Sequence, residues 1–133
     1  MSYLLDTNAW SSYLNYPSSP IRQRIARLHS SEIAFCSVVK AELLYGVYKS
    51  SKRDDNLASL VDIFKPFRSY VFDDAAALIY GQIRAELASR GTPIGPNDFL
   101  IAAIALANRL TLVTHNVSEF SKVPGLSVED WEA

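Results

Sequence analysis

Tyr3-Leu4-Leu5-Asp6-Thr7-Asn8, near the N-terminus, is the stretch that decides the fold. Its three apolar residues predict a short buried strand. The strand is expected to end at Asp6, because Asp, Thr and Asn fit poorly inside strands and favour turns and helix caps. In α/β folds, ligands bind at the carboxyl ends of the strands. Asp6 is therefore a candidate site residue if other polar side chains gather beside it.

Strands and helices are expected to alternate along the rest of the chain. The patterns predict strands at residues 32–36, 70–72, 110–113 and 126–128, and helices at residues 9–15, 21–29, 38–49, 75–90 and 96–108. A further helix carries Leu57 to Phe64 and ends before Pro66. Ser19 and Ser37 are expected to cap helices. Helices between strands favour a parallel sheet covered on both faces, and the sequence has no linker or internal repeat.

The composition narrows the class of protein. Of the 133 residues, 49% are hydrophobic and 20% charged, which is typical of a globular chain, and the net charge of −1 argues mildly against a simple nucleic-acid-binding module. The single cysteine, Cys36, lies in an apolar run and fits a reducing compartment. The sequence has neither a signal peptide nor the roughly 20 apolar residues of a membrane span. We therefore expect a cytoplasmic protein.

Two further carboxylates are candidates for the site. Glu42 lies at the border of a buried helix face, and Gly46 follows four residues later on the same side. A glycine inside a helix costs about 1 kcal/mol relative to alanine, so its presence needs a reason. Close approach of a substrate or of another backbone beside Glu42 would explain Gly46. A packing glycine next to a solvated glutamate explains it equally well. Asp98 falls in the first turn of the helix that begins at Pro96, where a purely structural aspartate is also common.

Oxygen-bearing side chains also follow the strand at residues 110–113. Asn116 offers an amide oxygen and Glu119 a carboxylate, whereas His115 lacks the histidine and cysteine partners of a zinc site. Hard oxygen ligands favour Mg²⁺ or Mn²⁺, which serve phosphoryl transfer. A phosphatase of the haloacid dehalogenase type needs a second aspartate where this chain has Asn8. A P-loop enzyme needs a glycine-rich loop with a lysine after the first strand, and the sequence has none.

Taken together and in this order, the motifs resemble the PIN-domain ribonucleases, and specifically the VapC toxins of bacterial toxin–antitoxin pairs. The matching segments are 4–8, 37–46, 91–98, 101–103, 112–120, 123–126 and 129–131. The resemblance implies a three-layer α/β/α sandwich around a short, mostly parallel central sheet, in a single PIN domain spanning residues 1–133. It also implies a Mg²⁺- or Mn²⁺-dependent endoribonuclease that cleaves RNA, such as tRNA, and so inhibits translation.

The resemblance also assigns roles to residues. Asp6, Glu42 and Asp98 would bind the metal, one carboxylate would help to deprotonate the attacking water, and Thr114 would form hydrogen bonds within the site. Many members of the family have a fourth acid near position 116. Asn116 leaves that position open, and Glu119 is the substitute candidate for a catalytic acid. Asn8 and Ser37 belong to the matching motifs and are expected to support the site.

The implied partners are an RNA substrate, a VapB-like antitoxin and a second copy of the chain. Candidate phosphate contacts are Arg22, Arg24, Arg27, Lys49, Lys52 and Arg53, although a solvated helix surface explains each cluster equally well. Candidate residues for an antitoxin groove are Tyr45, Tyr48, Leu57, Leu60 and Phe64, for most of which a place in the core is favoured. The alternative function is a catalytically inactive PIN fold that binds protein or RNA. Three converging acids argue against it, because without a cation their repulsion costs stability.

Overall fold

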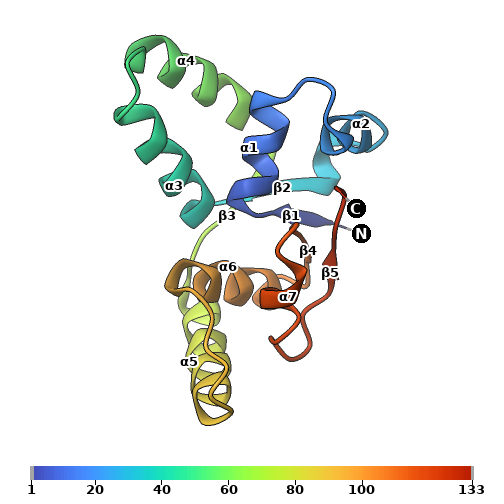
Figure 1. The fold of residues 1–133 in the computed structure, drawn as a ribbon, viewed down its shortest axis with the longest axis vertical. Coiled ribbons are helices and arrows are strands. Elements are labelled where there is room, and N and C mark those ends of the chain that lie inside the picture. Colours follow the sequence, from blue (N-terminus) through green and yellow to red (C-terminus); the bar gives the residue numbers. More distant parts are fainter. Residues whose placement is uncertain (1, 133) are drawn as a thin grey trace.

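A five-stranded sheet runs through the middle of the computed structural model, which describes residues 2–132 (Figure 1). Its strands are β1 (Tyr3–Leu5), β2 (Ile33–Cys36), β3 (Arg68–Tyr70), β4 (Thr111–Val113) and β5 (Val128–Glu129). They lie in the order β3-β2-β1-β4-β5, and every described pairing is parallel. The strand that precedes Asp6 is therefore the central one, with Leu4 opposite Ala34 on one side and Leu112 on the other.

Helices cover both faces of this sheet, as Figure 1 shows. On one side lie α1 (Thr7–Asn15), α2 (Pro20–Ala26), α3 (Ser37–Tyr48) and α4 (Arg53–Phe64); on the other lie α5 (Asp74–Ser89), α6 (Pro96–Ala107) and α7 (Val117–Phe120). The predicted three-layer α/β/α architecture is confirmed, and the sheet is parallel throughout the described pairings. No helix within residues 2–132 has the length and apolar character needed to cross a membrane.

Buried side chains fix β1 from both faces. Trp10 of α1 stacks on Phe35 of β2 with ring centroids 3.8 Å apart, and its indole N–H donates to the Ala34 carbonyl at 3.3 Å. On the opposite face, α6 buries Phe99 and the run 101–105, in which three of the five residues are alanine. Such small side chains let a helix lie close to a sheet. The carboxyl end of β1 is therefore held in a rigid setting.

Both edge strands begin two residues away from their expected starts. β3 comprises Arg68–Tyr70 rather than 70–72, and β5 comprises Val128–Glu129 rather than 126–128. The apolar runs at these places suggested strands, but backbone pairing decides the register: Ala34 lies opposite Arg68, and Val113 opposite Glu129. An edge strand exposes part of its surface and need not be apolar, so hydrophobicity was a poor guide to both boundaries.

Several helix boundaries differ from the predicted ones, and α1 begins at Thr7 rather than at residue 9. α2 ends at Ala26 rather than residue 29, and a 3-10 turn at Ser30–Glu32 follows it; α7 was not predicted. The prediction that Ser37 caps a helix is wrong, because α3 follows β2 directly, with Cys36 at the N-cap position and Ser37 as the first helical residue. Ser19, by contrast, caps α2 as expected by accepting the Arg22 N–H at 3.2 Å.

Candidate active site at the carboxyl edge of the sheet

Asp6 occupies the point at which β1 passes into α1, and its carboxylate is almost completely buried. One oxygen, Oδ1, accepts the backbone N–H of Ala9 at 2.9 Å, so that Asp6 is also the N-cap of α1. The other, Oδ2, accepts the hydroxyl of Thr114 at 2.6 Å. Burial raises the pKa of Asp6 above its usual value, while the bonds from Thr114 and Ala9 lower it and the charges of Glu132 and Glu42 raise it further.

Glu42 reaches this site from the neighbouring strand, because β2 lies beside β1 and α3 follows it directly. Its Oε1 accepts the hydroxyl of Thr7, the first residue of α1, at 2.6 Å. The side chain is half-buried, at one end of a groove between α1, α3 and α4. A single hydrogen bond therefore holds the orientation of Glu42 and joins two helices across the site.

Asp98 lies in the first turn of α6, after Gly95 and Pro96. Its pKa is raised to about 6, chiefly by burial and then by the charges of Glu119, Asp6 and Glu42. Glu119, in α7, accepts the Gly95 backbone N–H through Oε1 at 2.8 Å and thereby ties α7 to the start of α6. Glu119, Asp6 and Glu42 thus all lie close enough to Asp98 for their charges to act on it.

The carboxylates do not form a closed ligand cage. Within residues 2–132, the one group of three acidic, histidine or cysteine side chains whose ligand atoms all lie within 4.8 Å of one another is His115, Asp130 and Glu132. A hydrogen bond of 3.0 Å between His115 Nδ1 and Asp130 Oδ2 accounts for much of that cluster without a metal ion. Asp6, Glu42 and Asp98 are spread more widely, as expected for buried like charges.

Of the four residues expected to support the site, Thr114 contacts one of its acids directly, and Asn116, Asn8 and Ser37 lie in different settings. Thr114 is buried against Asp6, as the resemblance implied, and also accepts the Asn116 backbone N–H at 2.9 Å. The Asn116 amide is exposed and donates to Glu119 Oε2 at 3.4 Å, whereas the charge of Glu119 acts directly on Asp98. Asn8 is exposed in the first turn of α1, and Ser37 is half-buried at the start of α3; no described hydrogen bond joins either side chain to an acid of the site.

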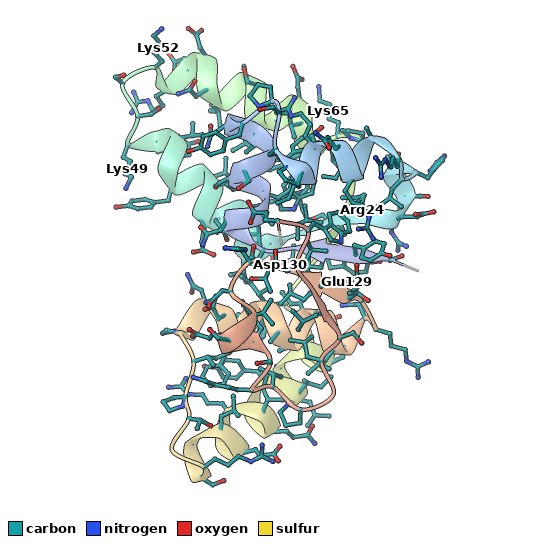
Figure 2. The ribbon with its side chains drawn as sticks, turned by 45° about the vertical axis from the view of Figure 1, so that its right-hand side comes forward. Arg24, Lys49, Lys52, Lys65, Glu129 and Asp130 are labelled. Carbon is teal, nitrogen blue, oxygen red and sulfur yellow. The ribbon has the colours of Figure 1, made fainter. Side chains whose placement is uncertain are left out.

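The two groups of basic residues also differ. In α2, Arg22 donates to the Tyr13 carbonyl and Arg24 lies 3.5 Å from Glu129, so both guanidinium groups already have partners within the chain; Arg27 is exposed. The second group, Lys49, Lys52 and Arg53, is exposed at the turn between α3 and α4. Figure 2 shows Lys49 and Lys52 there and Arg24 near Glu129 on the other side of the molecule. Arg53 lies 4.0 Å from Asp54, so Lys49 and Lys52 are the better available for a polyanion.

The groove that starts at Glu42 has a volume of about 450 Å³. Its apolar lining comes mainly from Leu14, Leu43, Leu60 and Ile63. Of the residues expected to floor an apolar groove, Leu60 lines this one, whereas the rings of Tyr45 and Tyr48 are exposed elsewhere on α3. Phe64 packs against the core, and Leu57 is half-buried outside the lining.

Sequence reasoning missed two residues of this site. Asn8 rather than Thr7 was predicted to support the site, although both belong to the motif that opens the chain. The hydroxyl of Thr7 at the start of a helix, next to a buried carboxylate, could have indicated its role. Glu132 lies near Asp6 because β5 pairs with β4 and brings the C-terminal segment to α1, where Ser12 donates to Glu132 at 2.9 Å. Nothing in the local sequence of Glu132 indicates this position.

The donor set fits a hard divalent cation. Asp6, Glu42, Asp98 and Glu119 offer only carboxylate oxygens, the ligands that Mg²⁺ and Mn²⁺ prefer. Burial raises the pKa of Asp98 to about 6, the charges of Glu119, Asp6 and Glu42 add to the shift, and a bound cation would offset that repulsion. The hydroxyls of Thr7 and Thr114 hold two of the carboxylates in fixed orientations.

Comparison with known proteins agrees with this geometry. The PIN domain family matches residues 3–126. The chain is 40% identical to Ribonuclease VapC2 of Rickettsia felis over 99% of both chains, and 38% identical to the tRNA(fMet)-specific endonuclease VapC of Salmonella typhimurium over 98% of both. The solved structure of DNA-bound VapBC from Salmonella typhimurium superposes with a TM-score of 0.92, at 38% identity and 98% coverage of both chains. The chain therefore belongs to the PIN domain family and, within it, to the VapC ribonucleases.

Proposed function

We propose that this chain is a Mg²⁺- or Mn²⁺-dependent endoribonuclease and the toxin of a toxin–antitoxin pair. The observation that carries the proposal is the meeting of Asp6, Glu42 and Asp98, from three separate segments, at one edge of the sheet, where their charges act on one another. A protein without catalytic use for them gains nothing from this repulsion. The alternative, an inactive PIN fold that binds protein or RNA, leaves the three acids unexplained.

The roles of the side chains follow from their settings. Asp6, Glu42 and Asp98 hold the cation, and Glu119 serves as the fourth acid beside Asp98. When bound, Mg²⁺ or Mn²⁺ neutralises charge on the scissile phosphate and makes a water molecule more acidic. One carboxylate accepts the proton of the attacking water. Thr114 and Thr7 keep Asp6 and Glu42 in place, so that little reorganisation is needed during the reaction.

The exposed cations near the site are suited to the phosphates of RNA. Lys49, Lys52 and Arg53 at the turn between α3 and α4 are the main candidates, because their charges are not buried in the fold. Arg27 is a weaker candidate on α2, and Arg22 and Arg24 would have to leave partners within the chain. The proposed substrate is a structured RNA, with initiator tRNA as the first to be tested, because a relative 38% identical to this chain bears the name of a tRNA(fMet)-specific endonuclease.

The proposed partners are a VapB-like antitoxin and a second copy of the chain, acting as a single-domain protein in the cytoplasm. Solved relatives include VapBC from Salmonella typhimurium and VapBC2 from Rickettsia felis, which are 38% and 37% identical to this chain. The apolar groove has a volume of about 450 Å³, and a peptide segment bound in it would lie against Glu42. An antitoxin bound there would block the site.

The test is cleavage of purified tRNA by the purified protein. We expect cleavage with Mg²⁺ or Mn²⁺, none after EDTA is added, and none with Asp6→Asn, whose amide is nearly the same size as the carboxylate. Circular dichroism and the melting temperature serve as controls for folding of the variant. Cleavage that persists in EDTA would exclude the metal mechanism, and unchanged activity of Asp6→Asn would remove Asp6 from the site.

A further inference from the structure

A ridge of exposed side chains leads away from the acidic site along α3. Tyr45 and Tyr48 are 67% and 56% exposed, which is unusual for large aromatic rings. Lys49 follows them, with its ammonium group 4.9 Å from the centre of the Tyr45 ring. Nothing described in the core or in the groove requires either ring, since neither tyrosine belongs to the buried cluster or to the groove lining.

Helix geometry places this ridge next to Glu42. Tyr45 and Lys49 follow Glu42 by three and seven residues, so they lie within about 60° and 20° of it around the helix. At 1.5 Å per residue, Tyr45 stands roughly 4.5 Å and Lys49 roughly 10 Å further along the axis. Gly46 lies on the other side of Glu42, and a Cβ added there would meet no atom within 4 Å. The space beside Glu42 is therefore open on the side of Gly46.

We propose that Tyr45 and Lys49 bind an unpaired nucleotide of the RNA next to the phosphate that is cleaved, with its base stacked on the Tyr45 ring and its phosphate paired with Lys49. The proposal rests on the ribonuclease function proposed above and adds the form of RNA that the site accepts. Exposed aromatic rings combined with a cation are the usual means of holding single-stranded nucleic acid, because every base has a face that can stack. Tyr48 extends the same surface by one more turn of the helix.

Charge and position favour RNA over a protein partner on this ridge. A peptide helix needs an apolar surface, and the chain offers one in the groove lined by Leu14, Leu43, Leu60 and Ile63, which Tyr45 and Lys49 do not line. The ridge is instead aromatic and carries the charge of Lys49, and Lys52 adds a second positive charge at the turn beyond α3, where Arg53 is paired with Asp54. The apolar partner and the polyanion thus have separate surfaces on the two sides of Glu42.

The experiment compares two fluorescent RNAs, a hairpin with an unpaired loop and the same strand annealed to its complement. Binding is measured by anisotropy in the Asp6→Asn background, which prevents cleavage. We expect the parent to bind the hairpin more tightly than the duplex, and Tyr45→Ala to weaken hairpin binding about ten-fold with little effect on the duplex. Tyr45→Phe should retain hairpin binding within about two-fold, whereas Tyr45→Leu, which is apolar but cannot stack, should behave as Tyr45→Ala does.

Two further variants complete the test. Lys49→Gln should weaken binding of both RNAs and lower the slope of log K against log salt by about 0.7, the value for one phosphate contact on a single strand. Tyr16→Ala is the matched control, because Tyr16 is 64% exposed at the far end of α1 and should leave both affinities unchanged. Melting temperatures should not change, since both tyrosines are exposed.

The outcomes separate this inference from the proposed function. If the wild-type protein cleaves tRNA but Tyr45→Ala binds the hairpin as tightly as the parent, the nucleotide site is wrong and the ribonuclease function stands. Equal loss of binding in Tyr45→Ala and Tyr16→Ala would also overturn it, as would loss of antitoxin binding alone in Tyr45→Ala. If the wild-type protein cleaves no RNA under any metal condition, the proposed function itself fails.

Discussion

The hydroxyl of Thr7 makes a short hydrogen bond to Glu42, a proposed metal ligand, and the sequence analysis did not predict this bond. It donates to Glu42 at 2.6 Å and joins the start of α1 to the middle of α3. Thr7→Val keeps the shape of the side chain and removes the donor, whereas Thr7→Ser keeps the donor. A hydrogen bond to a charged group is worth about 1.5–3 kcal/mol, so we expect kcat for RNA cleavage to fall about ten-fold or more in Thr7→Val.

Thr7→Ser is the control for Thr7→Val, because it keeps the hydroxyl that donates to Glu42. Thr7→Ser should cleave RNA at close to the wild-type rate, and KM should change little in either variant, because Thr7 orients Glu42 and does not contact RNA. The measurement is steady-state cleavage of a labelled tRNA with saturating Mg²⁺. Equal kcat values for Thr7→Val and Thr7→Ser would show that the hydroxyl has no positioning role.

Asp98 makes the stability of the metal-free protein depend on pH. Its pKa is about 6 in the folded protein and 3.8 ordinarily, so the folded state binds more protons than the unfolded state between these values. The free energy of unfolding therefore rises as the pH falls through about 6, and burial of Asp6 adds to the effect in the same direction. In EDTA, we expect a higher melting temperature at about pH 5.5 than at about pH 7.5.

Asp98→Asn isolates the contribution of this one group. The amide carries no charge, so the variant should melt at a higher temperature than the wild type near pH 7.5 and show a smaller rise on acidification. The difference between the two melting curves removes the effect of other titrating groups. Parallel curves for the two proteins would mean that the pKa of Asp98 is not raised in the folded protein.

At the scale of the helix, Gly46 in α3 and Gly81 in α5 form a matched pair. A Cβ would meet no atom within 4 Å at either position, so no backbone among the described residues 2–132 explains either glycine. Each Gly→Ala change should stabilise the protein by roughly 0.5–1 kcal/mol in urea unfolding. Gly46 lies one helical turn beyond Glu42, however, next to where the cleaved phosphate would bind, so Gly46→Ala should also slow RNA cleavage several-fold, and Gly81→Ala should not.

This pair distinguishes two explanations of the glycine beside Glu42. The sequence suggested close approach either of a backbone or of a substrate, and within residues 2–132 no backbone comes near. Loss of cleavage in Gly46→Ala alone would leave the substrate as the reason. Full activity of the stabilised Gly46→Ala protein would mean that the glycine has no role in the site.

Elements with one strongly apolar face could be predicted well from the sequence, and elements fixed by long-range pairing could not. β1, β2 and β4 are buried apolar runs that end in polar residues, so their carboxyl ends, with Asp6 and Thr114, were evident. β3 and β5 lie at the edges, where partner strands set the register. The turn after α6 places Arg109 at a φ of 54°, a conformation for which glycine is the usual residue, so no local signal marked it.

The same distinction applies to the candidate site: residues that follow buried apolar strands could be predicted, and residues brought in by long-range contacts could not. Asp6 and Thr114 follow β1 and β4, two strands that are neighbours in the sheet, so their meeting follows from the alternation of strands and helices. The bond between Glu119 and the Gly95 N–H spans 24 residues, and Glu132 reaches the site through β5. Such contacts depend on the packed tertiary structure, and a single sequence carries no pattern for them.

For the whole molecule, the acids connect the layers of the sandwich. Asp6 follows the central strand, Glu42 belongs to a helix on one face of the sheet, and Asp98 to a helix on the other (Figure 1). Their repulsion pushes the layers apart at this edge, and a shared cation would hold them together. Mg²⁺ should therefore raise the melting temperature, by the equivalent of about 2.7 kcal/mol at a concentration 100 times its Kd.

The location of the cation can be read from variants in the two acidic clusters. Asp98→Ala should lose most of the Mg²⁺-dependent rise in melting temperature, because it removes a ligand from the proposed site. His115→Ala, which disrupts the cluster of His115, Asp130 and Glu132, should keep that rise in full. The measurement is thermal unfolding of each protein in EDTA and in a series of Mg²⁺ concentrations. The reverse result, a rise lost in His115→Ala and kept in Asp98→Ala, would move the cation to the second cluster and refute the assignment of Asp98 as a ligand.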